Sequence, residues 1–138
     1  MARGSAPQRE LGVRIIGLLD QVWPVLRGQG VSTGHNVVVY FGGSPMQFAA
    51  GVEVFSPFVA TDVVKPFATP EGDAVTAVHW GPYAEMRDAY AAIEAWLAAN
   101  GRRAAGPSWE VYGDSSDDPA KLRTDVFFLL GTEPGSAR

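Results

Sequence analysis

The stretch MRDAYAAIEAWLAANGRRAAGPSWEVY, residues 86–112, combines a helix, a stop signal and a strand. Apolar residues recur at intervals of three and four in its first half, which indicates an amphipathic helix that ends at Gly101. The closing GPSWEVY predicts a strand in which Glu110 and Tyr112 share one face, because strand side chains alternate between faces. Large aromatic residues then lie on both faces. Glu110 therefore either meets solvent or faces an aromatic cavity.

The first half of the chain repeats this pattern. At an offset of 71 residues the helix and its glycine stop align, pairing Ile15 with Met86, Leu19 with Tyr90, Val22 with Ile93, Val25 with Trp96, Leu26 with Leu97 and Gly30 with Gly101. One more residue of offset aligns Gly34 with Gly106 and Tyr40 with Tyr112. We therefore predict an α+β fold, a pseudo-twofold duplication of a strand-helix-strand-strand unit with antiparallel sheet and two long helices.

The expected elements follow from the same patterns. Helices are predicted at 10–26 and 82–100, and strands at 35–41, 46–55, 74–80, 106–112 and 122–130, with a short further strand at 61–67. Pro24 should kink or shorten the first helix. Residues 2–10, ARGSAPQRE, are polar and few, so the opening strand of the first repeat is either missing or a poor edge strand.

The repeats are expected at about 10–67 and 73–131 within one domain, 1–138, that ends in a flexible tail, 132–138. The predicted buried stripe of the second helix is Met86, Tyr90, Ile93, Trp96 and Leu97. Trp23, Trp96 and Trp109 are expected in the core. An opening strand that is missing would leave a sheet edge unpaired, which a homodimer could cover.

Composition excludes several function classes. The chain has no cysteine and two histidines, so we expect no disulfide, no thiolate nucleophile, no metal site and no cofactor. A net charge of -4 without a basic stripe argues against nucleic acid. The N-terminus has no apolar signal core, and no apolar run approaches the roughly 18 residues of a membrane span, so a cytoplasmic protein is expected.

The motifs HWGPY, AY and AWL in the helix, NG, GPSWEVY and a closing TDVFFL strand resemble the GyrI-like small-molecule-binding domain, also the effector-binding half of MerR- and AraC-type bacterial regulators. The resemblance covers about 11–131 and is densest at 79–130. It implies a cleft between the repeats that receives aromatic, frequently cationic compounds, with a central glutamate at the position of Glu110. The first repeat has Val38 at the equivalent position, and no helix-turn-helix segment is found.

The resemblance also implies a set of site residues. The expected ligand-binding residues are Glu110, Tyr112, Tyr90, Tyr83, Trp80, Tyr40 and Asn36. Facing such a cavity, Glu110 could pair with a delocalised cation, while the rings add cation–π attraction of about 0.5–2 kcal/mol per contact. The alternative for Glu110 is a solvated position at a strand edge. The alternative for Asn36 is to brace its turn. His79 is expected to brace the Gly-Pro turn or a cavity rim, and Glu53 to lie on the polar face of a sheet.

Three functions remain open from the sequence. The first is a stand-alone effector-binding protein that senses or sequesters an aromatic, cationic, drug-like molecule. The second, implied by the resemblance, is a hydrolase that opens strained rings of aromatic natural products, with Glu110 as base and Tyr112 or Tyr83 as proton donor. The third is an interaction module that inhibits or protects a larger protein such as a topoisomerase. The first is the function we expect, and an enzyme is the alternative.

Overall fold

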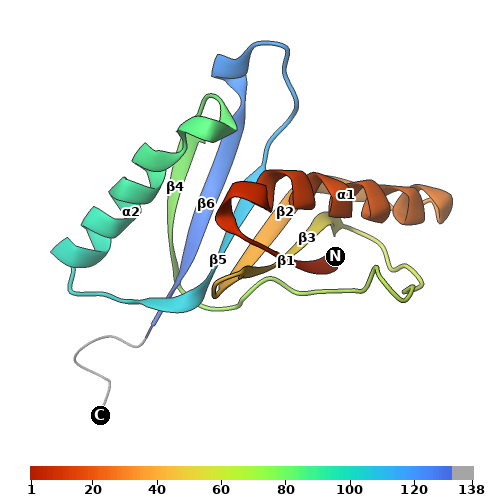
Figure 1. Cartoon of the computed structure of the whole chain (residues 1–138), viewed down its shortest axis with the longest axis horizontal. Coiled ribbons are helices and arrows are strands. Elements are labelled where there is room, and N and C mark those ends of the chain that lie inside the picture. Colours follow the sequence, from red (N-terminus) through yellow and green to blue (C-terminus); the bar gives the residue numbers. More distant parts are fainter. Residues whose placement is uncertain (132–138) are drawn as a thin grey trace. The chain divides into compact units, whose positions relative to one another are not determined.

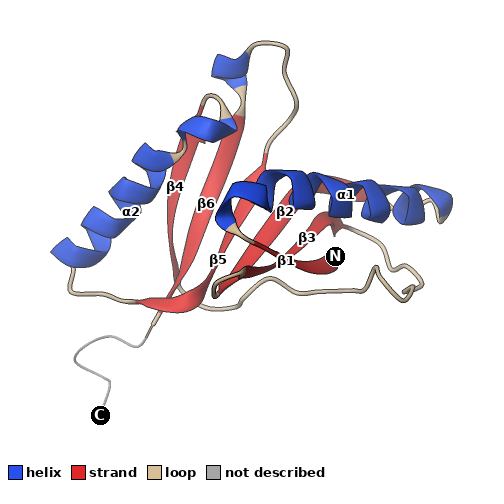
Figure 2. Ribbon diagram, viewed as in Figure 1, coloured by secondary structure: helices blue, strands red, loops and turns tan. Residues whose placement is uncertain are grey.

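The computed structural model of the chain describes residues 1–131, and the predicted tail at 132–138 lies outside the described residues. The chain divides into two compact units, Met1–Thr69 and Pro70–Arg138. Each unit contains one long helix and three strands, in the order strand, helix, strand, strand (Figure 2). Within residues 1–131 no helix is both long and apolar enough to cross a membrane.

The first unit has its helix between the first and second strands. Its elements are β1 (Ala2–Ala6), the short 3-10 helix η1 (Gln8–Glu10), α1 (Leu11–Gly28), β2 (Thr33–Gly42) and β3 (Met46–Val54). The strands are antiparallel and lie in the order β1-β3-β2. The helix continues through Pro24, so this proline does not end it.

The second unit has the same arrangement. Its elements are β4 (Ala74–Trp80), η2 (Tyr83–Glu85), α2 (Arg87–Ala99), β5 (Ala104–Tyr112), η3 (Pro119–Lys121) and β6 (Arg123–Leu130). Its antiparallel strands lie in the order β4-β6-β5, which matches β1-β3-β2 strand for strand (Figure 1). The duplication and the α+β class predicted from the sequence are therefore confirmed.

The opening strand of the first repeat is present, which decides an alternative that the sequence left open. β1 pairs along its whole length with β3, from Ala2 opposite Ala50 to Ala6 opposite Met46. Its helix-facing residues are small because α1 packs closely on them. A Cβ on Gly4 would lie 2.9 Å from Leu18 Cδ1 and 3.1 Å from Phe48 Cζ. The strand whose absence would have left an edge for a homodimer to cover is thus present, and the homodimer itself stays a prediction.

The registers show which residues of the two units are equivalent. Ala50 of β3 lies between Ala2 and Val38. In the second unit Val126 of β6 lies between Ala77 and Glu110 in the same way. Val38 and Glu110 therefore occupy the same place in the duplicated fold, on the side of the sheet that the helix covers.

Each helix buries one stripe against its sheet. The buried stripe of α1 contains Leu11, Leu18, Val22 and Leu26. In the second unit the core joins Met86, Ala89 and Ile93 to Val126, with Tyr90 and Leu97 packed against it. The prediction of a buried Trp96 is wrong, because its side chain is 40% exposed and Ala89 takes part in the stripe instead. Trp109 is buried as predicted and Trp23 is half-buried.

The segment after β3 is a loop, so the short strand predicted at 61–67 is wrong. Pro57, Pro66 and Pro70 remove backbone donors along it, which disfavours a ladder of hydrogen bonds. The loop instead makes one mutual main-chain contact with the chain start, where Met1 N donates to Lys65 O and Lys65 N to Met1 O. Figure 1 shows it passing beside β1, and its Val64 is fully buried.

Candidate functional site

The second unit holds a buried carboxylate between two tyrosines. Glu110 on β5 is 6% exposed. The Tyr90 hydroxyl on α2 donates to its Oε2, and the Tyr112 hydroxyl on the same strand donates to its Oε1. Burial of a carboxylate is costly without hydrogen bonds, and two hydroxyl donors reduce this cost. Glu110 is therefore not the solvated edge residue that the sequence allowed.

Local sequence explains how these three groups meet. Glu110 and Tyr112 are two residues apart on one strand, so both point to the face covered by α2. Val126, directly opposite Glu110 on β6, belongs to one core cluster with Met86, which directly precedes α2, and Ile93 of α2. Tyr90 is one helical turn after Met86 on the same buried stripe, which brings its hydroxyl to the carboxylate.

The HWGPY turn adds a further ring to this cluster. Gly81 has φ 128°, a backbone conformation that favours glycine, and it directs the chain from β4 into η2. His79 Nε2 lies 3.0 Å from the Pro82 carbonyl oxygen and braces this turn. Tyr83 follows, and its ring meets the Tyr112 ring edge-on at 5.4 Å between centroids. Half of the Tyr83 side chain is exposed, so it lies where the cluster reaches solvent.

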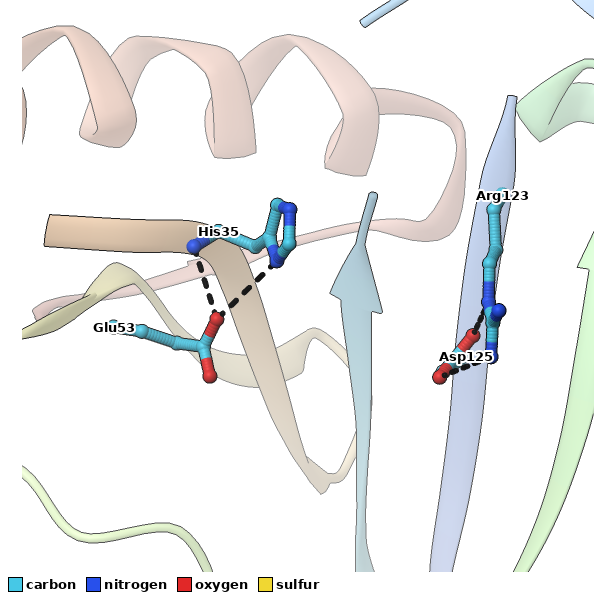
Figure 3. A network of polar contacts seen from close by, with 4 residues as sticks. All are labelled: His35, Glu53, Arg123 and Asp125. Atoms are coloured by element: carbon cyan, nitrogen blue, oxygen red, sulfur yellow. Dashed lines mark hydrogen bonds and ion pairs between the residues drawn. The ribbon is translucent and has the colours of Figure 1, made fainter. Parts of the chain in front are cut away.

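Trp80 is not brought together with Glu110. It is the last residue of β4 and lies opposite Arg123 of β6. Because strand side chains alternate between faces, its side chain lies on the opposite face of the sheet from those of His79 and Thr124. Its ring contacts the Arg123 guanidinium at 5.6 Å. Arg123 in turn binds Asp125 at 2.7 Å (Figure 3), and this hydrogen bond and the negative charge raise the pKa of Arg123. Trp80 therefore belongs to an exposed surface pair.

Asn36 and Tyr40 lie in the first unit, on the helix-covered side of β2. Asn36 Oδ1 accepts a 2.9 Å hydrogen bond from Trp23 Nε1 on α1, so it braces helix against sheet. Tyr40 is partly buried and lies opposite Phe48 of β3. Glu53, the other carboxylate considered, is bound by the main-chain N–H of His35 and by its ring (Figure 3). That pair is exposed on the sheet, as its sequence context indicated.

Thr124 is a polar residue of this region that the sequence reasoning did not single out. It lies opposite Tyr112 on β6 and is fully buried. Its Oγ1 has no hydrogen-bond partner among residues 1–131. The available signal was its position in the TDVFFL strand, two residues before the core residue Val126. The interior beside Glu110 thus contains one hydroxyl, that of Thr124, without a hydrogen-bond partner among residues 1–131.

Within the described part of the chain, no three side chains of His, Asp or Glu come close enough to hold a metal ion. The site therefore consists of Glu110 with Tyr90, Tyr112 and Tyr83 around it. Phe128 extends the aromatic wall, since its ring meets Tyr90 edge-on at 5.8 Å. An anionic oxygen pair beside π-faces is suited to a cation with an extended apolar body. Ligand binding by these residues stays a prediction, as does the cleft expected between the repeats.

Comparison with known proteins gives a family and a fold. A family model of the GyrI-like small molecule binding domain matches residues 44–130. The crystal structure of the EcmrR C-terminal domain is similar at a TM-score of 0.66 and 20% identity, covering 95% of this chain and 89% of that one. In the EcmrR–DNA complex the TM-score is 0.65 at 21% identity, covering 95% of this chain. This chain spans about half of that EcmrR chain, 52%.

A hydrolase from Listeria innocua is also similar, with a TM-score of 0.62 at 12% identity, covering 94% of this chain and 85% of that chain. Among curated proteins, none matches the sequence. At these identities the structural matches establish the fold alone. The EcmrR C-terminal domain and a protein named as a hydrolase share this fold, so the choice between binding and catalysis has to come from the site itself.

Proposed function

The chain belongs to the family of GyrI-like small molecule binding domains, and we propose that it binds aromatic cations with Glu110 as the anchor. The observation that carries this proposal is a carboxylate, 6% exposed, that accepts hydrogen bonds from the hydroxyls of Tyr90 and Tyr112. A charge in this position is expensive for the fold, and such a cost is typical of a site with a function.

The surrounding rings support a cationic ligand. The Tyr83–Tyr112 and Tyr90–Phe128 pairs are both edge-to-face, which presents the negative face of one ring beside the edge of another. A cation near Glu110 would gain from both the carboxylate and the ring faces, while a neutral ligand of the same shape would gain only apolar contact. The proposed function is therefore selective for charge as well as shape.

A matched pair of probes tests this. 1-Naphthyltrimethylammonium carries a fixed positive charge, and 1-tert-butylnaphthalene is its neutral isostere. Binding is measured by quenching of tryptophan fluorescence and by the rise of the unfolding temperature with ligand concentration. We expect the cation to bind more tightly, and Glu110→Gln to weaken it by about tenfold, which equals 1.4 kcal/mol, while the neutral isostere changes less than about twofold.

The matched control is Glu53→Gln, which removes the same charge from an exposed carboxylate that His35 binds. It should leave both affinities within about twofold of the wild type, because exposed charges are screened. Unchanged cation binding in Glu110→Gln, or an equal loss in Glu53→Gln, would exclude Glu110 as the anchor. A wild type that prefers the neutral isostere would exclude the cationic ligand class.

The second candidate is a hydrolase that adds water across a strained ring, with the hydroxyl oxygen bonding to one ring carbon and a proton to the other. The observation that favours it is the direct contact of the Tyr112 hydroxyl with the Glu110 carboxylate, which pairs a base with a proton donor. A cyclopropane-bearing aromatic substrate incubated with the protein would gain the mass of one water, and Tyr112→Phe would abolish this gain. No gain over hours leaves the binding function alone.

A further inference from the structure

The first unit contains a cavity of about 490 Å³, open to solvent, on the side of its sheet that α1 does not cover, and its charged lining residues Arg3, Asp62 and Lys65 are exposed. Arg3 and Ala49, which pair across β1 and β3, form its floor. Asp62, Lys65 and Phe67 of the loop after β3 form its walls. Pockets for small ligands are typically about 300–1,000 Å³, so this cavity has room for one.

The loop that walls the cavity is held at several points. Its Lys65 exchanges main-chain hydrogen bonds of 2.7 and 2.9 Å with Met1. The Gln29 side chain, beyond the end of α1, both donates to and accepts from the main chain of Val59. Val64 is 1% exposed and anchors the loop between these points. The cavity is therefore formed without a ligand, which lowers the cost of ordering on binding.

Aromatic rings hold the guanidinium of Arg3, one of the positively charged groups that line the cavity. The Arg3 guanidinium lies 4.6 Å from the centre of the Phe41 ring and 6.0 Å from that of Phe67. The two rings meet edge-on at 6.0 Å. Among residues 1–131 no carboxylate lies within ion-pair distance of Arg3 or Lys65. Two side-chain cations thus line the cavity against one acid, Asp62.

We propose that this cavity is a second ligand site, which binds a small aromatic anion, a carboxylate or sulfonate. The anionic group binds Arg3 and Lys65, and a guanidinium already held by two rings loses little freedom on binding it. The aromatic body packs against Phe67 and Pro66. This site has the opposite charge preference from the one at Glu110 and shares no residue with it, so the two sites can be tested separately.

The probe is 8-anilinonaphthalene-1-sulfonate, compared with N-phenyl-1-naphthylamine, which has the same rings without the sulfonate. Both fluoresce in apolar surroundings, so titration gives their dissociation constants. We expect one sulfonate site per chain. Arg3→Gln and Lys65→Gln should each weaken the sulfonate at least about fivefold, and the uncharged amine less than about twofold. Lys65 holds the loop through its main chain, so Lys65→Gln keeps those bonds.

The matched control is Arg9→Gln, which removes the same charge from an exposed residue of η1 that does not line the cavity. It should change neither dissociation constant more than about twofold. Glu110→Gln should leave the sulfonate affinity unchanged, whatever it does to cationic probes. Sulfonate binding that survives both cavity variants, that falls equally in Arg9→Gln, or that Glu110→Gln abolishes would overturn the proposal.

Discussion

The two units share one fold but differ in what they bury at equivalent positions. The first has Leu19, Val38 and Tyr40 where the second has Tyr90, Glu110 and Tyr112. Val38 is fully buried and apolar, whereas Glu110 is a buried acid held by two hydroxyls. The same backbone position is therefore used for packing in one unit and for a charge in the other.

This difference shows how a duplicated fold gains a polar interior. The carboxylate of Glu110 comes together with a donor from the helix, Tyr90, and a donor from its own strand, Tyr112. The first unit has the strand tyrosine, Tyr40, but a leucine at the helix position. We infer that the helix tyrosine is the change that lets a carboxylate be buried here, and substitutions of Leu19, Val38, Tyr90 and Glu110 test this.

The largest effect is expected from Val38→Glu. It places a carboxylate at the equivalent position of the first unit, which is fully buried and has Leu19 in place of the helix donor. An uncompensated buried charge should lower the free energy of unfolding by about 3–5 kcal/mol. Urea unfolding at pH 7 measures this loss.

Two further variants sharpen the result for Val38→Glu. The double variant Leu19→Tyr, Val38→Glu should recover part of the lost stability, because the new hydroxyl can donate to the new carboxylate. The reverse exchange, Glu110→Val, removes a charge instead of adding one and should cost less than Val38→Glu. If Val38→Glu and Glu110→Val lowered the free energy of unfolding equally, the two positions would not differ in how well they accommodate a carboxylate.

A smaller effect is expected from Tyr90→Phe. It removes the hydroxyl that donates to Glu110 Oε2 while it keeps the ring packed on Phe128. A hydrogen bond to a charged group contributes about 1.5–3 kcal/mol, so stability should fall by that amount. The control Tyr83→Phe removes the hydroxyl of a half-exposed tyrosine and should change stability by less than about 0.5 kcal/mol.

A double-mutant cycle then isolates the pair. In a Glu110→Leu background Tyr90→Phe should cost much less than in the wild type, since the acceptor is gone. The same cost in both backgrounds would mean that the Tyr90 hydroxyl stabilises the unit through some other group, and the proposed role of the helix tyrosine would fail.

The next largest effect on stability is expected in β1, the opening strand of the first unit. Gly4→Ala adds a methyl group that would meet the side chains of Leu18 and Phe48 at 2.9 and 3.1 Å, so these side chains must shift. Overpacking of this kind costs about 1–3 kcal/mol, and we expect the lower half of that range because a side chain can move. Gly12→Ala, on α1 with nothing within 4 Å, should instead raise stability by up to about 1 kcal/mol. A neutral Gly4→Ala would contradict close packing of α1 on β1.

The sequence predicted most of the fold because helix stripes, glycine stops and strand alternation are local signals. It left β1 open because residues 2–10 are polar and few, whereas this strand forms through its pairing with the distant β3 and the close approach of α1 at Gly4. The strand predicted at 61–67 was wrong because the β-branched run there lies among prolines. Its main-chain hydrogen bonds join Thr61 to Val64 within the run and Lys65 to Met1, and do not form a ladder with a neighbouring strand.

The candidate site was predictable in part. Alternation along β5 put Glu110 and Tyr112 on one face, and the repeat put Tyr90 on the helix stripe. Trp80 was grouped with them through its neighbours in the HWGPY motif, but alternation along β4 sends it to the other face, beside Arg123. The cavity proposed to bind an anion has no sequence signature, because the two cationic side chains that line it, Arg3 and Lys65, are distant along the chain.

The smallest effect is expected from Trp96, which the sequence placed in the core at the position equivalent to Val25. Its side chain is 40% exposed, because the stripe that faces the sheet passes through Ala89 and Ile93 instead. Trp96→Val, which installs the residue of the first unit, should therefore cost less than about 1 kcal/mol. Acrylamide should also quench the fluorescence of Trp96 less readily than that of Trp80, which is 60% exposed, and more readily than that of the buried Trp109. A loss of 3 kcal/mol or more, about what a buried tryptophan costs, would mean that α2 presents a different face from α1 and that the helices are not equivalent.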